Sequence, residues 1–241
     1  MIDRGTADAL SRITQRSNDL LHAYRSGFEP ETRDAAADLR PVRVLDPLSV
    51  AAPEGAYFLS RGPDGATHLS RDGGFAVRGG LLVDGQGAPV LGYAPGGSTG
   101  GVPGAIRVDA VDAALGRVRD ARIEADGSVA YTRTAVDPRS GARRDERVVA
   151  GRLALARFPA GTAPIRVDAT HVEAPRGVAP ALGVATDGTF GALSTFARDV
   201  GRLDLTAGLQ RLQEAYQSFE AMRAAHSARG AVDKTTMDLV K

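Results

Sequence analysis

The sequence predicts a mainly β protein. An antiparallel β body of hairpins, either a sandwich or a small barrel, is flanked by N- and C-terminal α-helices that pair as a coiled coil. Apolar residues recur at helical spacing near both ends of the chain, this spacing is absent between them, and Asp-Gly pairs recur in the middle. We therefore expect an N-terminal helical segment at 1–38, a β-rich body at 39–198 and a C-terminal helical segment at 199–241.

The N-terminal segment carries apolar residues at the a and d positions of a heptad, with Ser17 at the remaining a position. Residues 6–25 contain neither Pro nor Gly, which predicts one amphipathic helix. Gly27 is placed to end this helix, and Pro30 lies just beyond it. The predicted apolar stripe consists of Leu10, Ile13, Leu20 and Tyr24.

The middle of the chain alternates short apolar runs with turn residues, as expected for strands joined by tight turns. Asp-Gly favours positive φ at the glycine and so closes hairpins. Residues 94–104 are rich in Gly, Pro and Ser and predict a loop. The Asp-Gly pairs begin at Asp64, Asp72, Asp84, Asp126 and Asp187.

The C-terminal segment carries a second heptad stripe, and Gly230 is expected to interrupt its helix and leave a short last segment at 232–240. A helix cannot bury such a stripe on itself. The two stripes can pair with each other, within one subunit or between subunits, or each can pack on the β body. The second stripe consists of Leu205, Leu209, Leu212, Tyr216 and Phe219.

Composition excludes several classes of function. The chain has no Cys, which rules out disulfides and thiolate metal sites. A net charge of +1 argues against a nucleic-acid-binding surface. No apolar run is long enough for a membrane helix, so no membrane insertion is expected. The polar N-terminus has no secretory signal pattern.

Motifs for chemistry are weak, and we expect no enzymatic activity and no cofactor. Residues 96–100 fit the Gly-x-Ser-x-Gly pattern of hydrolases, but Pro95 and Pro103 flank them, and the motif needs a strand before it and a helix after it. A hydrolase using this loop is a minor alternative. The four histidines show no metal-ligand spacing, so no metal site is expected; they are His22, His68, His171 and His226.

Several phrases resemble one family. Residues 18–28 begin with Asn and close with Gly-Phe, and residues 47–52 read Pro-Leu-Ser-Val-Ala-Ala. Residues 71–75 read Arg-Asp-Gly-Gly-Phe, and residues 87–92 read Gly-Ala-Pro-Val-Leu-Gly. Together with residues 123–129, residues 151–158 and the two terminal helices, these phrases resemble the rod and hook proteins of the bacterial flagellar basal body, in the same order along the chain. The inner Asn residues of the first phrase are missing here.

The resemblance implies a structural subunit of the flagellar rod, most like the proximal rod protein, with the distal position open. Its two helical segments would be polymerisation helices, and its partners would be copies of itself, other rod proteins and the flagellar export apparatus. Export would need no cleaved signal, and the location would be the periplasmic rod. The alternative is a secreted or surface β-rich binding module with a helical stalk. The residues expected to determine turns or close backbone approach are Asp72, Gly73, Gly87 and Gly92.

Overall fold

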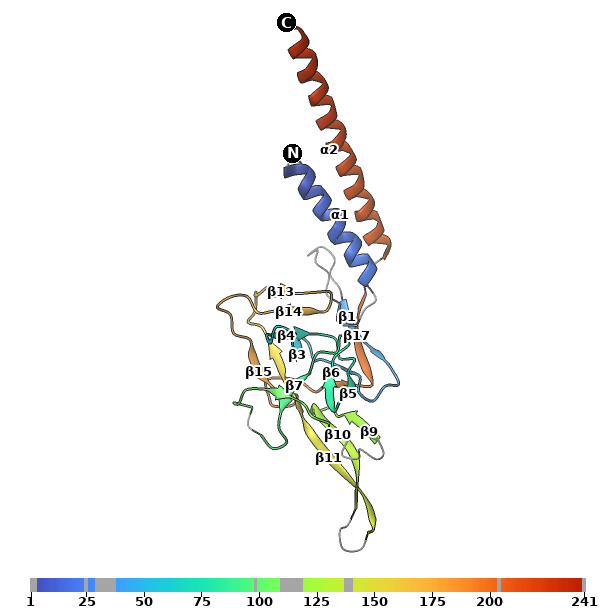
Figure 1. Cartoon of the computed structure of the whole chain (residues 1–241), viewed down its shortest axis with the longest axis vertical. Coiled ribbons are helices and arrows are strands. Elements are labelled where there is room, and N and C mark those ends of the chain that lie inside the picture. Colours follow the sequence, from blue (N-terminus) through green and yellow to red (C-terminus); the bar gives the residue numbers. More distant parts are fainter. Residues whose placement is uncertain are drawn as a thin grey trace. The chain divides into compact units, whose positions relative to one another are not determined.

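The computed structural model describes residues 4–23, 26–28, 38–97, 99–108, 119–136, 141–202 and 205–239. The chain separates into two compact units, a helical unit that holds both α-helices and a β unit, here called the body, that spans residues 25–29 and 39–201. The protein is mainly β, with antiparallel sheets and an N-terminal and a C-terminal helix (Figure 1). This confirms the predicted mainly β class with terminal helices.

Two open antiparallel sheets form most of the body. The larger sheet has the strand order β13-β14-β4-β3-β12-β15, and the second has the order β8-β7-β11-β10-β9. The first contains β3 (Ala56–Arg61), β4 (Thr67–Ser70), β12 (Leu155–Arg157), β13 (Ile165–Arg166), β14 (His171–Glu173) and β15 (Ala181–Gly183). The second contains β7 (Leu91–Tyr93), β8 (Gly104–Ala105), β9 (Arg119–Ile123), β10 (Ser128–Val136) and β11 (Arg143–Leu153).

Three two-stranded ribbons complete the described strands. They pair β1 (Asp38–Arg43) with β17 (Ala197–Arg202), β2 (Val50–Ala51) with β16 (Ser194–Thr195), and β5 (Ala76–Arg78) with β6 (Leu81–Val83). Because β17 continues to Arg202, strand structure extends past the boundary expected at residue 198.

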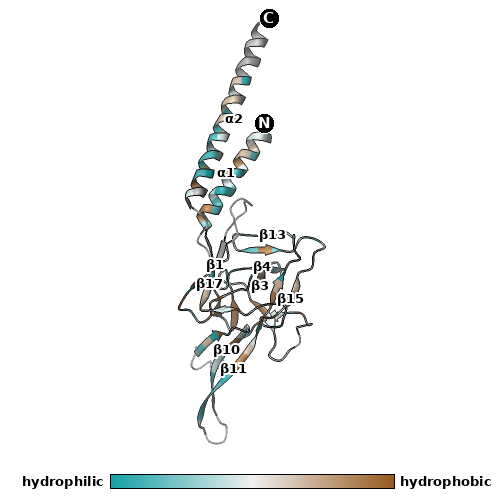
Figure 2. Ribbon diagram, turned by 180° about the vertical axis from the view of Figure 1, so that it is seen from behind, coloured by the Kyte–Doolittle hydropathy of each residue, from teal (hydrophilic) through white to brown (hydrophobic). Residues whose placement is uncertain are grey.

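The larger sheet buries both of its faces at its strands β3 and β12. Phe58 and Leu155 belong to one apolar core, whereas Leu59 and Ala156, their immediate neighbours in sequence, belong to a second core. Side chains alternate across a strand, so these neighbours must lie on opposite faces. Figure 2 shows many apolar residues in the strands of the body, whereas the far half of the β10–β11 hairpin is hydrophilic.

Four of the five Asp-Gly pairs lie in turns, where the aspartate oxygens accept backbone N–H groups. Gly65 and Gly127 have φ of +81° and +82° and close the β3–β4 and β9–β10 hairpins. In the turn that begins at Asp84 the positive φ falls at Gly87 (+88°) instead. Glycine is favoured there because L side chains clash with the backbone in this region.

The hairpin expected at Asp72-Gly73 is wrong. β4 pairs with β3 and β14, whereas the next strand, β5, pairs with β6, so residues 71–74 connect two different sheets. Gly73 is needed for a different reason: a Cβ at this position would lie 1.7 Å from the Val50 carbonyl oxygen. Val50 in turn donates its N–H to the Gly73 carbonyl oxygen at 3.0 Å, which holds the two backbones together.

The helices are α1 (Arg4–His22) and α2 (Leu205–Leu239). α1 ends at His22, so Gly27 is not its cap and instead lies in the body. α2 continues through Gly230 as one helix of 35 residues, so the expected interruption is wrong. A glycine inside a helix costs about 1 kcal/mol relative to alanine, which a long helix can absorb.

Gly92 gives a direct test of backbone packing in the body. A Cβ at Gly92 would lie 2.2 Å from the Arg152 carbonyl oxygen and 2.6 Å from Cδ1 of Ile106. We expect Gly92→Ala to lower the free energy of unfolding by about 1–3 kcal/mol, as overpacking does. Gly104, its partner on β8, has open space at the same position, so Gly104→Ala is the matched control. Equal urea midpoints for the two variants would contradict this account.

Candidate functional site

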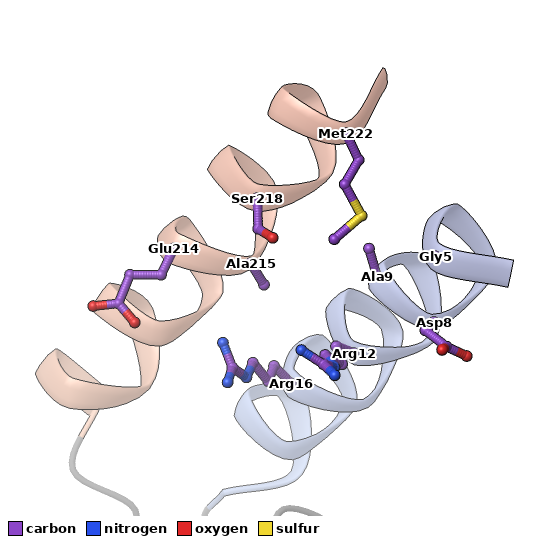
Figure 3. A pocket seen from close by; sticks show the side chains of 9 residues that line it. All are labelled: Gly5, Asp8, Ala9, Arg12, Arg16, Glu214, Ala215, Ser218 and Met222. Carbon is purple, nitrogen blue, oxygen red and sulfur yellow. The ribbon is translucent and has the colours of Figure 1, made fainter. Parts of the chain in front are cut away.

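The two helices lie side by side and contact each other within the helical unit (Figure 1). Figure 3 shows a pocket between them, with side chains of both helices pointing into it. Arg16 donates a hydrogen bond from Nη1 to the backbone carbonyl of Arg211, which joins α1 to α2. The pocket is lined by Gly5, Asp8, Ala9, Arg12, Arg16, Glu214, Ala215, Ser218 and Met222.

The residues between the helices follow a heptad-like spacing of their own. On α1, Gly5, Ala9, Arg12 and Arg16 are separated by four, three and four positions. On α2, the residues 215, 218 and 222 are separated by three and four. Helical neighbours three and four apart share one face, so each helix presents a continuous face to the other. Small residues on both faces suit a close approach of the two axes.

The predicted apolar stripes lie on other faces of the same helices. At about 100° per residue, the α1 stripe is centred roughly a quarter turn from the face that lines the pocket, and the α2 stripe roughly a third of a turn. Leu10, Leu209 and Tyr216 are 49%, 58% and 51% exposed. Ile13 is buried, and Leu20, Leu212 and Phe219 are partly buried. Tyr24 and the Leu205 side chain lie outside the described residues.

Arg71, the first residue of the Arg-Asp-Gly-Gly-Phe phrase, forms a buried ion pair with Asp199. The Arg71 guanidinium contacts the Asp199 carboxylate at 2.6 Å, and the Asp199 side chain is 2% exposed. Arg71 also donates to the carbonyl oxygens of Pro53 and Ala56 at 2.9 and 2.8 Å. Burial raises the pKa of Asp199, and the charge of Arg71 opposes this shift. This pair joins residues 128 positions apart.

The Gly-Phe and Arg-Asp-Gly phrases meet in space. A Cβ at Gly27 would lie 2.2 Å from the Asp72 backbone nitrogen, and Gly27 has φ of +68°, which also favours glycine. Phe28 is completely buried, and the Arg166 guanidinium lies 5.3 Å from the centre of its ring. Gly27 donates its N–H to the Asp199 carbonyl oxygen at 2.9 Å. Gly27 therefore allows two backbone segments to approach closely, and Phe28 packs in the interior.

Two of the four histidines, expected to be single, come together in the body. The rings of His68 and His171 are 5.7 Å apart. His171 is held between two carboxylates, with Nδ1 2.9 Å from Asp168 and Nε2 3.1 Å from Asp84. Burial opposes its positive charge, but the hydrogen bond to Asp84 and the charge of Asp168 outweigh burial and raise the pKa of His171. Both ring nitrogens of His171 are therefore engaged.

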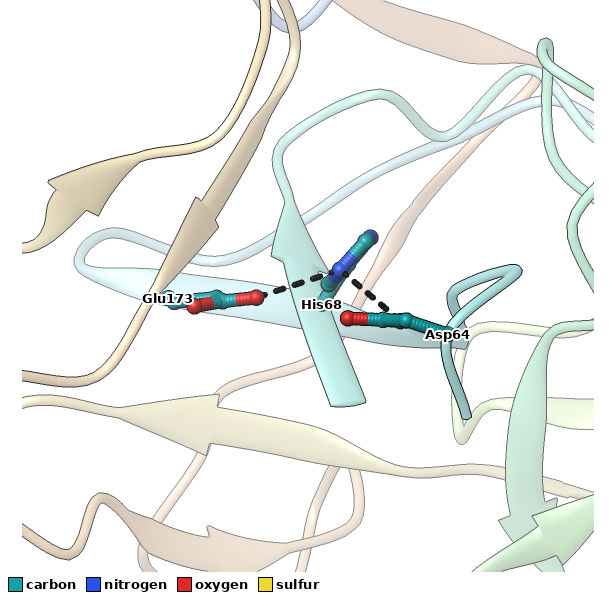
Figure 4. A group of neighbouring side chains, drawn as sticks. All are labelled: Asp64, His68 and Glu173. Carbon is teal, nitrogen blue, oxygen red and sulfur yellow. Dashed lines mark ion pairs between the residues drawn. The ribbon is translucent and has the colours of Figure 1, made fainter. Parts of the chain in front are cut away.

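His68 contacts a different pair of carboxylates. Its Nε2 lies 3.2 Å from Glu173 Oε1 and 3.7 Å from Asp64 Oδ1 (Figure 4). Sequence spacing could not reveal this cluster, because β14 brings Glu173 beside β4 from 105 positions away. The sequence feature that could have indicated this cluster is the spacing of four between Asp64, in the β3–β4 turn, and His68, in β4.

The Gly-x-Ser-x-Gly loop lacks the setting of a nucleophile. β7 ends at Tyr93 before the loop, and among the described residues the chain continues through turns to β8 at Gly104. Ser98 itself lies outside the described residues. A nucleophile elbow requires a helix directly after the serine, and the described residues that follow form none.

Comparison with known protein families matches no family model, and comparison with curated proteins finds no match. Among the helices described, neither has a stretch both long and apolar enough to cross a bilayer.

Proposed function

We propose that this chain is a structural subunit of the bacterial flagellar rod that polymerises through its two terminal helices. One observation carries the proposal: helices from opposite ends of the sequence lie side by side, yet Leu10, Leu209 and Tyr216 remain about half exposed. A helix pair that buried its own apolar residues between its two helices would cover these side chains. Exposed apolar residues on both helices, with Leu209 and Tyr216 one heptad apart on α2, fit contacts with neighbouring subunits.

A polymer that transmits torque needs contacts that repeat without closing into a ring. In this proposal the small-residue faces join α1 to α2 within a subunit, and the predicted apolar stripes pair between subunits as coiled coils. The stripes then gain their burial on assembly. The partners are copies of this chain, other rod proteins and the flagellar export apparatus, and the proximal rod is the favoured position.

The geometry of the body supports a structural role. The phrases that resemble the rod family place Gly27, Gly73 and Arg71 at close backbone approaches and in a buried ion pair. These features hold distant parts of the chain together, and a load-transmitting subunit requires such ties. We propose that the protein acts in the periplasmic rod after export without a cleaved signal, and that it has no enzymatic activity.

Deletion of residues 1–25 tests the proposal against the alternative of a stalked binding module. We expect the truncated chain to be expressed and to leave cells non-motile, because one of the two polymerisation helices is missing. A binding module would keep its ligand contacts, which lie in the β body, after the same deletion. Full swimming motility in cells that carry only the truncated chain would rule out the rod assignment.

Amide exchange tests the state of the helices before assembly. We expect amides of residues 8–22 to exchange much faster in the monomer than those of β3 and β12, because short helices gain most of their stability from packing and the stripes lack their partners before assembly. The measurement is hydrogen–deuterium exchange on a sample shown to be monomeric by sedimentation. Protection of residues 8–22 equal to that of the body strands would contradict the proposal.

A further inference from the structure

We propose that Asp64, His68 and Glu173 form a binding site for a divalent transition-metal ion, with Zn²⁺ as its simplest occupant. One ligand atom from each of the three residues lies within 4.8 Å of the others. They come from the β3–β4 turn, from β4 and from the end of β14. The inference concerns the body alone and does not depend on assembly through the helices.

The distances suit one ion. Nε2 of His68 lies 3.2 Å from Glu173 Oε1 and 3.7 Å from Asp64 Oδ1 (Figure 4). Bonds of about 2.1 Å from a tetrahedral Zn²⁺ separate its ligand atoms by about 3.4 Å, which lies between these two values. The Asp64 and Glu173 oxygens lie within 4.8 Å of each other, so adjustment of the exposed Asp64 side chain lets the three atoms converge on a common centre.

The ligand chemistry selects the class of ion. An imidazole nitrogen with carboxylate oxygens suits Zn²⁺ and its first-row neighbours, whereas Ca²⁺ takes six to eight oxygen ligands. Two carboxylates and a neutral imidazole carry a charge of −2, which balances a divalent cation. Three protein ligands leave a fourth position for water, as in open zinc sites.

Gly62 supplies an independent observation: its lack of a side chain allows two of the ligand side chains to approach its backbone closely. A Cβ there would lie 2.7 Å from His68 Nε2 and 2.7 Å from Asp64 Oδ1. The backbone of Gly62 is not in the positive-φ region, so its conformation does not require glycine. A side chain at Gly62 would therefore displace the His68 and Asp64 side chains that would bind the ion.

The surrounding groups orient the ligands. The Ala66 N–H donates to Asp64 Oδ1 at 3.0 Å and fixes that carboxylate in the turn. His68 is buried, whereas Asp64 is exposed, so an ion can enter from the Asp64 side. His171 is excluded as a fourth ligand in this arrangement, because Asp84 and Asp168 engage both of its nitrogens.

Calorimetric titration of the EDTA-treated full-length protein with ZnCl₂, in excess Mg²⁺, tests the site. We expect saturable binding of one Zn²⁺ per chain, and visible absorption of Co²⁺ in the same site that reports four-coordinate geometry. Glu173→Gln keeps the shape of the side chain but removes its charge, and we expect it to weaken Zn²⁺ binding at least about 100-fold. Gly62→Ala pushes a methyl group against the His68 and Asp64 side chains and should weaken binding while all three ligands remain.

His226→Gln is the matched control, because His226 is exposed on α2 and far from the three ligands in sequence. It should bind Zn²⁺ as the unaltered protein does. Circular dichroism establishes that each variant is folded. The proposal is overturned if the unaltered protein shows no saturable Zn²⁺ binding, or if Glu173→Gln and Gly62→Ala both bind as tightly as the control.

Discussion

Replacement of Arg71 by leucine should lower the free energy of unfolding of the body by about 3–5 kcal/mol, the usual cost of removing one partner of a buried ion pair. The variant leaves the Asp199 carboxylate buried without its cation. It also deprives the carbonyl oxygens of Pro53 and Ala56 of a donor. Urea unfolding followed by far-ultraviolet circular dichroism measures the loss.

The loss should depend on pH in a defined direction. Burial raises the pKa of Asp199 above its ordinary value, and loss of Arg71 removes the attraction that opposes this shift. A carboxyl group with a raised folded-state pKa favours folding below its unfolded-state pKa, and this contribution disappears as pH rises through the folded-state pKa. The difference between Arg71→Leu and the unaltered protein should therefore shrink as the pH is lowered.

Two further variants make this prediction specific. Arg133 forms an exposed ion pair with Glu146 at 2.8 Å, so Arg133→Leu removes the same side chain type at small cost. The double variant Arg71→Leu, Asp199→Leu should recover part of the lost stability, because no buried charge remains. A urea midpoint for Arg71→Leu equal to that of Arg133→Leu would show that the buried pair does not stabilise the body.

Local sequence signals predicted those parts of the fold that depend on neighbouring residues. The Asp-Gly pairs at Asp64 and Asp126 close hairpins because the aspartate and the positive-φ glycine act within one turn. The same dipeptide at Asp72 forms no hairpin, because the strands on its two sides pair with other strands, and its glycine is required instead by the distant Val50 backbone. An Asp-Gly pair therefore indicates that a glycine is needed. It does not show whether the glycine is needed for its positive φ or because a side chain would clash with a nearby backbone.

Long-range pairs explain what the sequence did not reveal. Arg71 and Asp199, like His68 and Glu173, meet because the fold brings segments distant in sequence together, and single charged residues carry no spacing signal across such distances. The helices show a similar limit. Their apolar heptads were evident, but small and charged residues such as Ala9 and Arg12 line the space between them. Periodicity locates a face on a helix and does not identify its partner.

Charge substitutions on the exposed stripe of α2 should abolish assembly while leaving the body folded. Leu209 and Tyr216 are about half exposed in the single chain, so neighbouring subunits can still bury the remaining area. Burial of that area is worth about 1–2 kcal/mol per side chain, and lysine adds the cost of burying a charge. Every subunit of the polymer carries the substitution, so the binding free energy is lost at each contact between subunits. Each 1.4 kcal/mol changes an association constant about tenfold. Leu209→Lys and Tyr216→Lys should each greatly reduce motility.

Gln217→Lys is the matched control because Gln217 is exposed beside Tyr216 but lies on a face of α2 away from both the stripe and α1. All three substitutions introduce the same side chain into the same helix, so helix propensity and net charge change similarly. Swimming assays report assembly, and thermal unfolding of the purified chains reports the body. Loss of motility in all three variants would point to the charge itself, whereas normal motility in Leu209→Lys and Tyr216→Lys would exclude the stripe as the contact between subunits.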